Sequence, residues 1–158
     1  WYKVHMPVYF YASWYSSKAT DVDVINMIEG YDAIKRRIED IQVKGYEATN
    51  KENGQLESLK VALEATARGI KFLPIDLYKS DATVWVVNSD NEIYPPFSSI
   101  DGLGDTVAKK IVEERDKGNF LSIEDVQKRG KVSATLIDKM KDMGILKDLP
   151  DSNQLTLF

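Results

Sequence analysis

Residues 100–112 have the sequence IDGLGDTVAKKIV, in which Gly102 and Gly104 stand on either side of one apolar residue, directly before a helical pattern. Glycine permits backbone dihedrals that a side chain forbids, and it leaves the amides of a tight bend accessible to a ligand. Such amides, followed by the positive end of a helix dipole, form an anion site. An isolated Gly-x-Gly more often marks an ordinary loop that enters a helix, so the neighbouring sequence decides between the two interpretations.

The sequence after these glycines favours a tandem helix-hairpin-helix. One side of a helix that Gly118 ends is lined by Leu103, Val107, Ala108, Ile111 and Val112. Ser122 is expected to cap a second helix with Asp125 as its capping-box acid, and Ser133 to cap a third. Hairpins of this kind contact nucleic-acid phosphates without reading the base sequence. The second bend, Gly130-Lys131-Val132-Ser133, has one glycine, so a purely structural helix pair stays an alternative there.

The N-terminal part of the chain is predicted to be helical, from residue 1 to about residue 70. A stripe at helical spacing is formed by Ile34, Ile38 and Ile41. Gly45 is expected to end this helix, and a polar loop is expected from Glu47 to Gly54. A further helix is predicted to carry on one face Leu56, Leu59, Leu63, Thr66 and Ala67.

A short β-hairpin is predicted between this helical part and the tandem motif. Residues 83–87 are β-branched and aromatic, residues 88–91 favour a turn, and residues 92–94 form the returning strand. The predicted fold class is therefore mainly α with a small β-hairpin (α+β). The predicted organisation is a helical segment at 1–70, a β-hairpin connector at 71–96, the tandem helix-hairpin-helix at 97–149 and a tail at 150–158.

Composition limits the chemistry that the chain can perform. The 158 residues carry a formal net charge of −4, include no cysteine and include one histidine, His5. A thiolate nucleophile, a disulfide framework and a histidine metal cluster are therefore excluded. The apolar run at residues 8–15 is too short to span a bilayer, and we expect a cytoplasmic protein without membrane contact. Because the chain opens at Trp1 instead of methionine, we expect a fragment of a larger protein.

The acidic net charge argues against capture of DNA by overall electrostatics, since non-specific affinity scales with the phosphates that Lys and Arg neutralise. Basic residues nevertheless gather around the two predicted hairpins, namely Lys109, Lys110, Lys117, Lys128, Arg129 and Lys131. Acidic residues lie among them, namely Glu113, Glu114, Asp116, Glu124 and Asp125. The charge pattern alone leaves a local basic face and a solvated surface of mixed sign equally open.

The C-terminal residues carry apolar side chains for which the motif offers no partner. These side chains belong to Leu155, Leu157 and Phe158, after the helix-breaking Pro150. One hypothesis is an extended anchor peptide whose apolar side chains fill a groove on a partner while Gln154 hydrogen-bonds at the edge of that groove. The other hypothesis is a tail that folds back on its own domain, and chemistry alone does not separate the two.

Several stretches resemble, in the right order, a family of bacterial replicative polymerases. They are residues 1–7, 9–12, 67–77, 100–112, 120–144 and 154–158. The first two are similar to part of the fingers of C-family polymerases, and the third to the Arg-Gly-Ile segment that precedes their hairpin domain. The last, Gln-Leu-Thr-Leu-Phe, is similar to the pentapeptide with which bacterial replication proteins dock on the sliding clamp. Together they resemble the C-terminal part of the PolC-type DNA polymerase III alpha subunit, the C-family replicative polymerase of Gram-positive bacteria.

This resemblance implies a piece of a DNA-directed DNA polymerase, a nucleotidyltransferase, that is inactive alone. The catalytic carboxylates and the Mg²⁺ of the family belong to a palm domain upstream, so no catalytic or metal-binding residue is carried over. Contact with the primer-template duplex is implied for Gly102, Leu103, Gly104, Thr106, Lys109, Gly130, Lys131 and Ser133. Sliding-clamp binding is implied for Gln154, Leu155, Thr156, Leu157 and Phe158. The remainder of the polymerase is a third implied partner, and some helix-hairpin-helix motifs also hold a monovalent cation on hairpin carbonyls.

Two hypotheses from other classes stay open. The first is a DNA-repair or adaptor module with paired hairpins and a clamp-binding tail, in which the N-terminal helices fold as an independent partner-binding domain. The second is a purely structural helical domain that binds neither DNA nor clamp.

Overall fold

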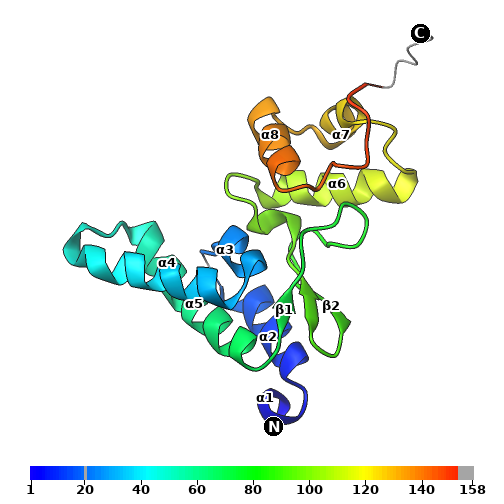
Figure 1. Cartoon of the computed structure of the whole chain (residues 1–158). Helices are drawn as coiled ribbons and strands as arrows, with labels where there is room; N and C mark the ends of the chain where they lie inside the picture. Colours follow the sequence, from blue (N-terminus) through cyan, green and yellow to red (C-terminus); the bar gives the residue numbers. More distant parts are fainter. Residues whose placement is uncertain (20, 153–158) are drawn as a thin grey trace. The chain divides into compact units, whose positions relative to one another are not determined.

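The computed structural model describes residues 1–19 and 21–152, and it divides into two compact units (Figure 1). The N-terminal unit contains Trp1–Leu73 and Val84–Pro95, and the hairpin unit contains Pro74–Thr83 and the chain from Pro96 onward. The structure therefore divides the predicted connector at 71–96. Its strands belong to the N-terminal unit, and residues 74–83 belong to the hairpin unit.

The N-terminal unit packs helices around a small sheet. Its elements are α1 (Tyr2–His5), α2 (Pro7–Ser17), α3 (Val24–Glu29), α4 (Tyr31–Lys44), η1 (Gly45–Glu47), α5 (Asn50–Ala67), β1 (Lys71–Phe72), β2 (Val86–Ser89) and β3 (Glu92–Tyr94). The stripe predicted on α4 is buried at Ile34, Ile38 and Ile41, and α4 ends before Gly45 as expected. The Tyr15 ring of α2 packs on Phe72 and Trp85, and its hydroxyl donates to the Ser58 carbonyl at 2.6 Å.

The sheet has three strands in the order β1-β3-β2. The predicted hairpin is present as the antiparallel pair β2 and β3, but β2 begins at Val86 and extends into the stretch predicted as a turn. The parallel pairing of β1 with β3 was not predicted. A two-residue strand has no alternating pattern of its own, so only its tertiary partner defines it. The prediction of a mainly α fold with a small β element is confirmed.

The start and the buried face of α5 differ from the prediction. The helix begins at Asn50, inside the expected loop, because Thr49 and Glu52 form a reciprocal capping box. Its buried residues are Ser58, Leu59, Ala62 and Ala65, whereas Ala67 is exposed. Leu56 and Leu63 of the predicted face are partly buried against the same core.

The hairpin unit contains η2 (Phe97–Ser99), α6 (Asp105–Lys117), α7 (Ile123–Gly130) and α8 (Ala134–Asp142) (Figure 1). The predicted caps are confirmed, since Ser122 accepts from the Asp125 amide and Ser133 accepts from the Leu136 amide. The core of the unit is formed by Phe97, Ile100, Leu103, Ala108, Ile111, Phe120, Val126, Val132, Ile137, Met140 and Leu146. Both bends therefore lie between helices that share one core.

Candidate nucleic-acid interface

The first hairpin is a tight turn that anchors one side chain and exposes two glycines. The Leu103 amide donates to the Ile100 carbonyl at 3.0 Å, and Gly102 has a φ of +86°. The Leu103 side chain is 3% exposed, whereas Gly102 and Gly104 are both exposed. Leu103 therefore fixes the turn to the core while the backbone on either side faces solvent.

The start of α6 has no side-chain cap, because its N-cap residue is Gly104. The first amides of a helix have no partner within the helix, and here they lie beside an exposed glycine. An ideal Cβ at Gly104 would meet no heavy atom within 4 Å, so the space beside this N-cap residue is open. Thr106 and Lys109 follow on the exposed surface of the same helix. The first hairpin thus has the geometry of an anion site.

The second hairpin is built differently. Gly130 is buried, and an ideal Cβ there would lie 3.1 Å from Ile111 Cγ1 and 3.1 Å from Val132 Cγ2. The left-handed position falls on Lys131, with a φ of 55° and an exposed side chain. The Ser133 hydroxyl is used to cap α8. The single glycine of this bend therefore serves close packing, and the exposed groups are a lysine and a helix start that carries its own cap.

Most of the basic residues around the hairpins are neutralised by acidic neighbours. Lys110 and Lys117 both lie near Glu114, at 3.6 Å and 2.7 Å, and Lys128 pairs with Glu124 at 2.7 Å. The hydrogen bond from Lys117 lowers the pKa of Glu114 and raises the pKa of Lys117. The bond between Lys128 and Glu124 likewise lowers the pKa of the carboxyl and raises that of the ammonium.

Two of the predicted DNA-binding lysines have no carboxylate paired with them in the described part of the chain. Across residues 1–19 and 21–152, the ammonium groups of Lys109 and Lys131 form no ion pair. Lys109 follows the first hairpin on α6, and Lys131 stands at the apex of the second hairpin. Of the two interpretations that the charge pattern left open, a surface of mixed sign therefore describes most of this cluster, apart from Lys109 and Lys131.

Arg129 is a structural residue that the sequence presented only as a member of a basic cluster. Its guanidinium donates to the carbonyls of Asn119, Gly118 and Glu114, and it lies 4.6 Å from the centroid of the Phe120 ring. It also contacts the Asp125 carboxylate at 3.1 Å. Arginine provides several donors in a rigid plane, so one side chain binds a carbonyl in the last turn of α6 and two carbonyls directly after the helix. The guanidinium of Arg129 therefore forms its hydrogen bonds within the hairpin unit.

The base of the C-terminal tail is bound to α7. The Ile123 amide donates to the Pro150 carbonyl at 2.8 Å, and the Glu124 amide donates to the Asp151 carbonyl at 3.1 Å. The Ser152 hydroxyl donates to the Glu124 carboxylate at 3.0 Å. The carbonyls of Pro150 and Asp151 thus satisfy amides in the first turn of α7. The predicted clamp-binding residues 154–158 lie outside the described residues.

Two further features of the described residues bear on the class of site. Within residues 1–19 and 21–152, no group of three or more His, Cys, Asp or Glu side chains is placed to hold a metal ion. No helix in the same part of the chain is both long and apolar enough to cross a membrane.

The chain belongs to the helix-hairpin-helix motif family, and the model of this family matches residues 69–155. Its whole length also aligns with proteins named DNA polymerase III PolC-type. The identity is 48% over 158 residues for Listeria welshimeri, 46% over 160 residues for Streptococcus sanguinis and 46% over 158 residues for Bacillus subtilis. The chain spans 11% of the length of each of these relatives. The resemblance to PolC-type polymerases is confirmed along the full chain.

Proposed function

We propose that this chain is the segment of a bacterial replicative DNA polymerase that holds the primer-template duplex and tethers the enzyme to the sliding clamp. The observation that carries the proposal is the first hairpin, where exposed Gly102 and Gly104 border helix amides without a side-chain cap. Membership in the helix-hairpin-helix family supports duplex binding, and identity with PolC-type segments supports the polymerase context. That context favours a polymerase segment over a repair or adaptor module.

In this proposal the two hairpins bind neighbouring phosphates by different means. The first presents backbone amides at Gly102, Leu103 and Gly104, supported by Thr106 and Lys109. The second presents the Lys131 ammonium, with Gly130 and Ser133 fixing its bend. Contacts of both kinds position a duplex without reading its sequence. Nucleotidyl transfer, its Mg²⁺ and a cytoplasmic location belong to the parent polymerase, and a monovalent cation on hairpin carbonyls is a further part of the proposal.

Duplex binding is tested by fluorescence anisotropy with the 158-residue chain and a labelled primer-template. We expect weak affinity that is equal for two duplexes of unrelated sequence. The logarithm of the binding constant should fall linearly with the logarithm of salt concentration, with a slope of about −0.9 for each phosphate neutralised. Absence of binding at low salt, or a marked preference for one duplex, would contradict the proposal.

The tail is tested separately by deleting residues 154–158. We expect isothermal titration calorimetry to show clamp binding by the intact chain and none by the truncated chain. Duplex affinity should be unchanged, because the deleted residues follow the segment that binds α7. Tethering would then raise processivity through the effective concentration of duplex near the hairpins. Equal clamp affinity of both chains would refute the anchor and leave the hairpin assignment intact.

A further inference from the structure

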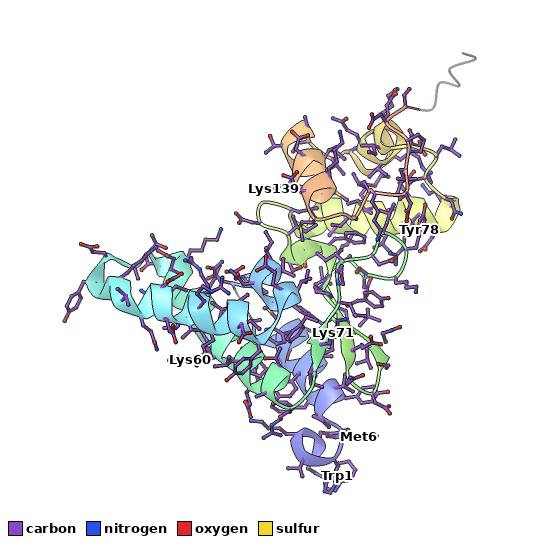
Figure 2. The ribbon with its side chains drawn as sticks, in the orientation of Figure 1. Trp1, Met6, Lys60, Lys71, Tyr78 and Lys139 are labelled. Atoms are coloured by element: carbon purple, nitrogen blue, oxygen red, sulfur yellow. The ribbon has the colours of Figure 1, made fainter. Side chains whose placement is uncertain are left out.

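Lys139 of α8 reaches the first hairpin, although the sequence separates them by more than thirty residues. Its Nζ donates to the Asp101 carbonyl at 2.9 Å and lies 3.9 Å from Asp101 Oδ2. An ideal Cβ at Gly102 would lie 3.7 Å from Lys139 Nζ and 3.7 Å from Leu136 Cδ2. Figure 2 shows Lys139 on α8 at the side of the unit where the loop before α6 passes. One face of α8 therefore supports the bend at Gly102.

The backbone of this bend belongs to a turn type with two competing arrangements. The hydrogen bond from the Leu103 amide to the Ile100 carbonyl closes a turn with Asp101 and Gly102 at its centre. Gly102 has a φ of +86°, and Lys131 is the only non-glycine residue with a positive φ in the part of the chain that the structure describes. A turn whose third residue, here Gly102, has a positive φ while its second residue has a negative φ is a type II turn. Type I differs mainly by a half rotation of the central peptide.

The central peptide, Asp101–Gly102, decides where the Gly102 amide points. The bond is planar, and the described chain contains no cis peptide, so its carbonyl and its N–H face opposite sides. The carbonyl faces Lys139. The N–H of the exposed Gly102 therefore faces away from the lysine, whereas rotation to type I would exchange the two groups.

We propose that Lys139 is a positioning residue that holds the Asp101–Gly102 peptide in the orientation in which the Gly102 amide donates to a DNA phosphate. This inference rests on the proposed duplex-binding function and assigns a role to a residue outside either hairpin. The lysine also offsets the charge of the Asp101 carboxylate, which is 70% exposed at the edge of the anion site. The Lys139 ammonium thus orients the Gly102 amide and weakens the repulsion between the Asp101 carboxylate and a phosphate.

The test compares Lys139→Met with Lys141→Met in the 158-residue chain. Lys141 lies on the same helix and is exposed, so its substitution removes the same charge from α8 without touching the turn. We expect duplex affinity to fall about tenfold for Lys139→Met, as for loss of a charge-assisted hydrogen bond, and less than about twofold for Lys141→Met. Lys139→Arg retains a donor and should keep affinity within about threefold of the wild type.

Two readouts separate positioning from direct phosphate contact. In the wild type, the Gly102 amide resonance should shift when duplex is titrated, and in Lys139→Met at saturating duplex most of that shift should be lost. The salt slope should stay near the wild-type value, whereas loss of a direct phosphate contact lowers it by about one. A reduced slope with an intact Gly102 shift would overturn the inference.

The outcomes also distinguish this inference from the proposed function. If the wild type fails to bind duplex, the proposed function fails. If the wild type binds, Gly104→Val does not, and Lys139→Met binds like the wild type, then only the role of Lys139 fails. Melting curves identify any variant whose fold has changed. Were Lys139→Met to lose its fold, loss of affinity in a folded Lys139→Arg chain would by itself overturn the inference, and retention would support it.

Discussion

The two hairpins have nearly the same backbone at their helix starts and use it in opposite ways. The N-cap dihedrals are φ −77° and ψ 167° at Gly104, and φ −68° and ψ 157° at Ser133. At the first hairpin the N-cap has no side chain, and the amides behind it stay open. At the second, the serine hydroxyl caps its own helix and the glycine is buried against Ile111. Equal backbone geometry therefore does not leave the first helix amides equally free of a side-chain cap.

The left-handed residue precedes the N-cap by two positions in both hairpins, but its residue type differs. At the first hairpin it is Gly102, which adopts a positive φ without steric cost. At the second hairpin it is Lys131, for which the left-handed region costs about 1–2 kcal/mol. We infer that the second bend accepts this cost because it presents an ammonium group at its apex. The comparison thus agrees with the proposal of amide contacts at one hairpin and a charge contact at the other.

The largest effect is expected when the same substitution is made at the two glycines. Gly104→Val adds a branched side chain in open space, at dihedrals that valine readily adopts. The fold should keep its melting temperature within about 2 °C, while the side chain covers the amides that face a phosphate. Loss of charge-assisted hydrogen bonds of about 2 kcal/mol corresponds to about 30-fold weaker duplex binding in anisotropy titrations.

Gly130→Val should give the opposite result. Its Cβ would meet Ile111 and Val132 at 3.1 Å, so the added methyl groups overfill the core. Overpacking of this kind costs about 1–3 kcal/mol, measured as a lower urea midpoint. Affinity per folded molecule should stay within about twofold of the wild type. If Gly130→Val weakened binding as Gly104→Val does while stability were unchanged, the second bend would be an amide site as well.

The sequence predicted the architecture of both hairpins because the signals involved are local. Glycine stops, serine caps and apolar spacing near 3.6 residues each act within one or two helical turns, and Ser122, Ser133 and Gly118 are placed as expected. The signal for the start of α5 is also local, because Thr49 and Glu52 stand at capping-box spacing. That signal was present in the sequence and was interpreted as a loop.

The difference between the hairpins could not be predicted in the same way. Whether Gly130 is buried depends on Ile111, which belongs to another helix. Whether a lysine is available depends on partners such as Glu114, which serves Lys110, Lys117 and Arg129 together. The pairs of Glu114 with Lys110 and Lys117 have i,i+4 and i,i+3 spacing on α6, which the sequence shows, whereas its contact with Arg129 of α7 depends on the packing of two helices.

An intermediate effect is expected from Lys131→Gly. Glycine relieves the left-handed strain of about 1–2 kcal/mol and adds about 0.4–1 kcal/mol of unfolded-state entropy, so the net change should stabilise the fold slightly. The lost ammonium should weaken duplex binding about fivefold and reduce the salt slope by about one. Chemical denaturation and anisotropy over a salt series measure the two effects. A chain with unchanged salt slope would show that Lys131 does not contact a phosphate.

The smallest effect, and the most selective, is expected from two adjacent lysines of α6. Lys109→Gln removes a charge without an acidic partner and should weaken duplex binding about threefold, with the salt slope reduced by about one. Lys110→Gln removes a charge that Glu113 and Glu114 already compensate, so affinity should change by less than about twofold. Anisotropy over the same salt series compares the pair. Equal losses from both substitutions would mean that the ion pairs on α6 open when DNA binds, and the distinction between paired and unpaired bases would then not describe the bound state.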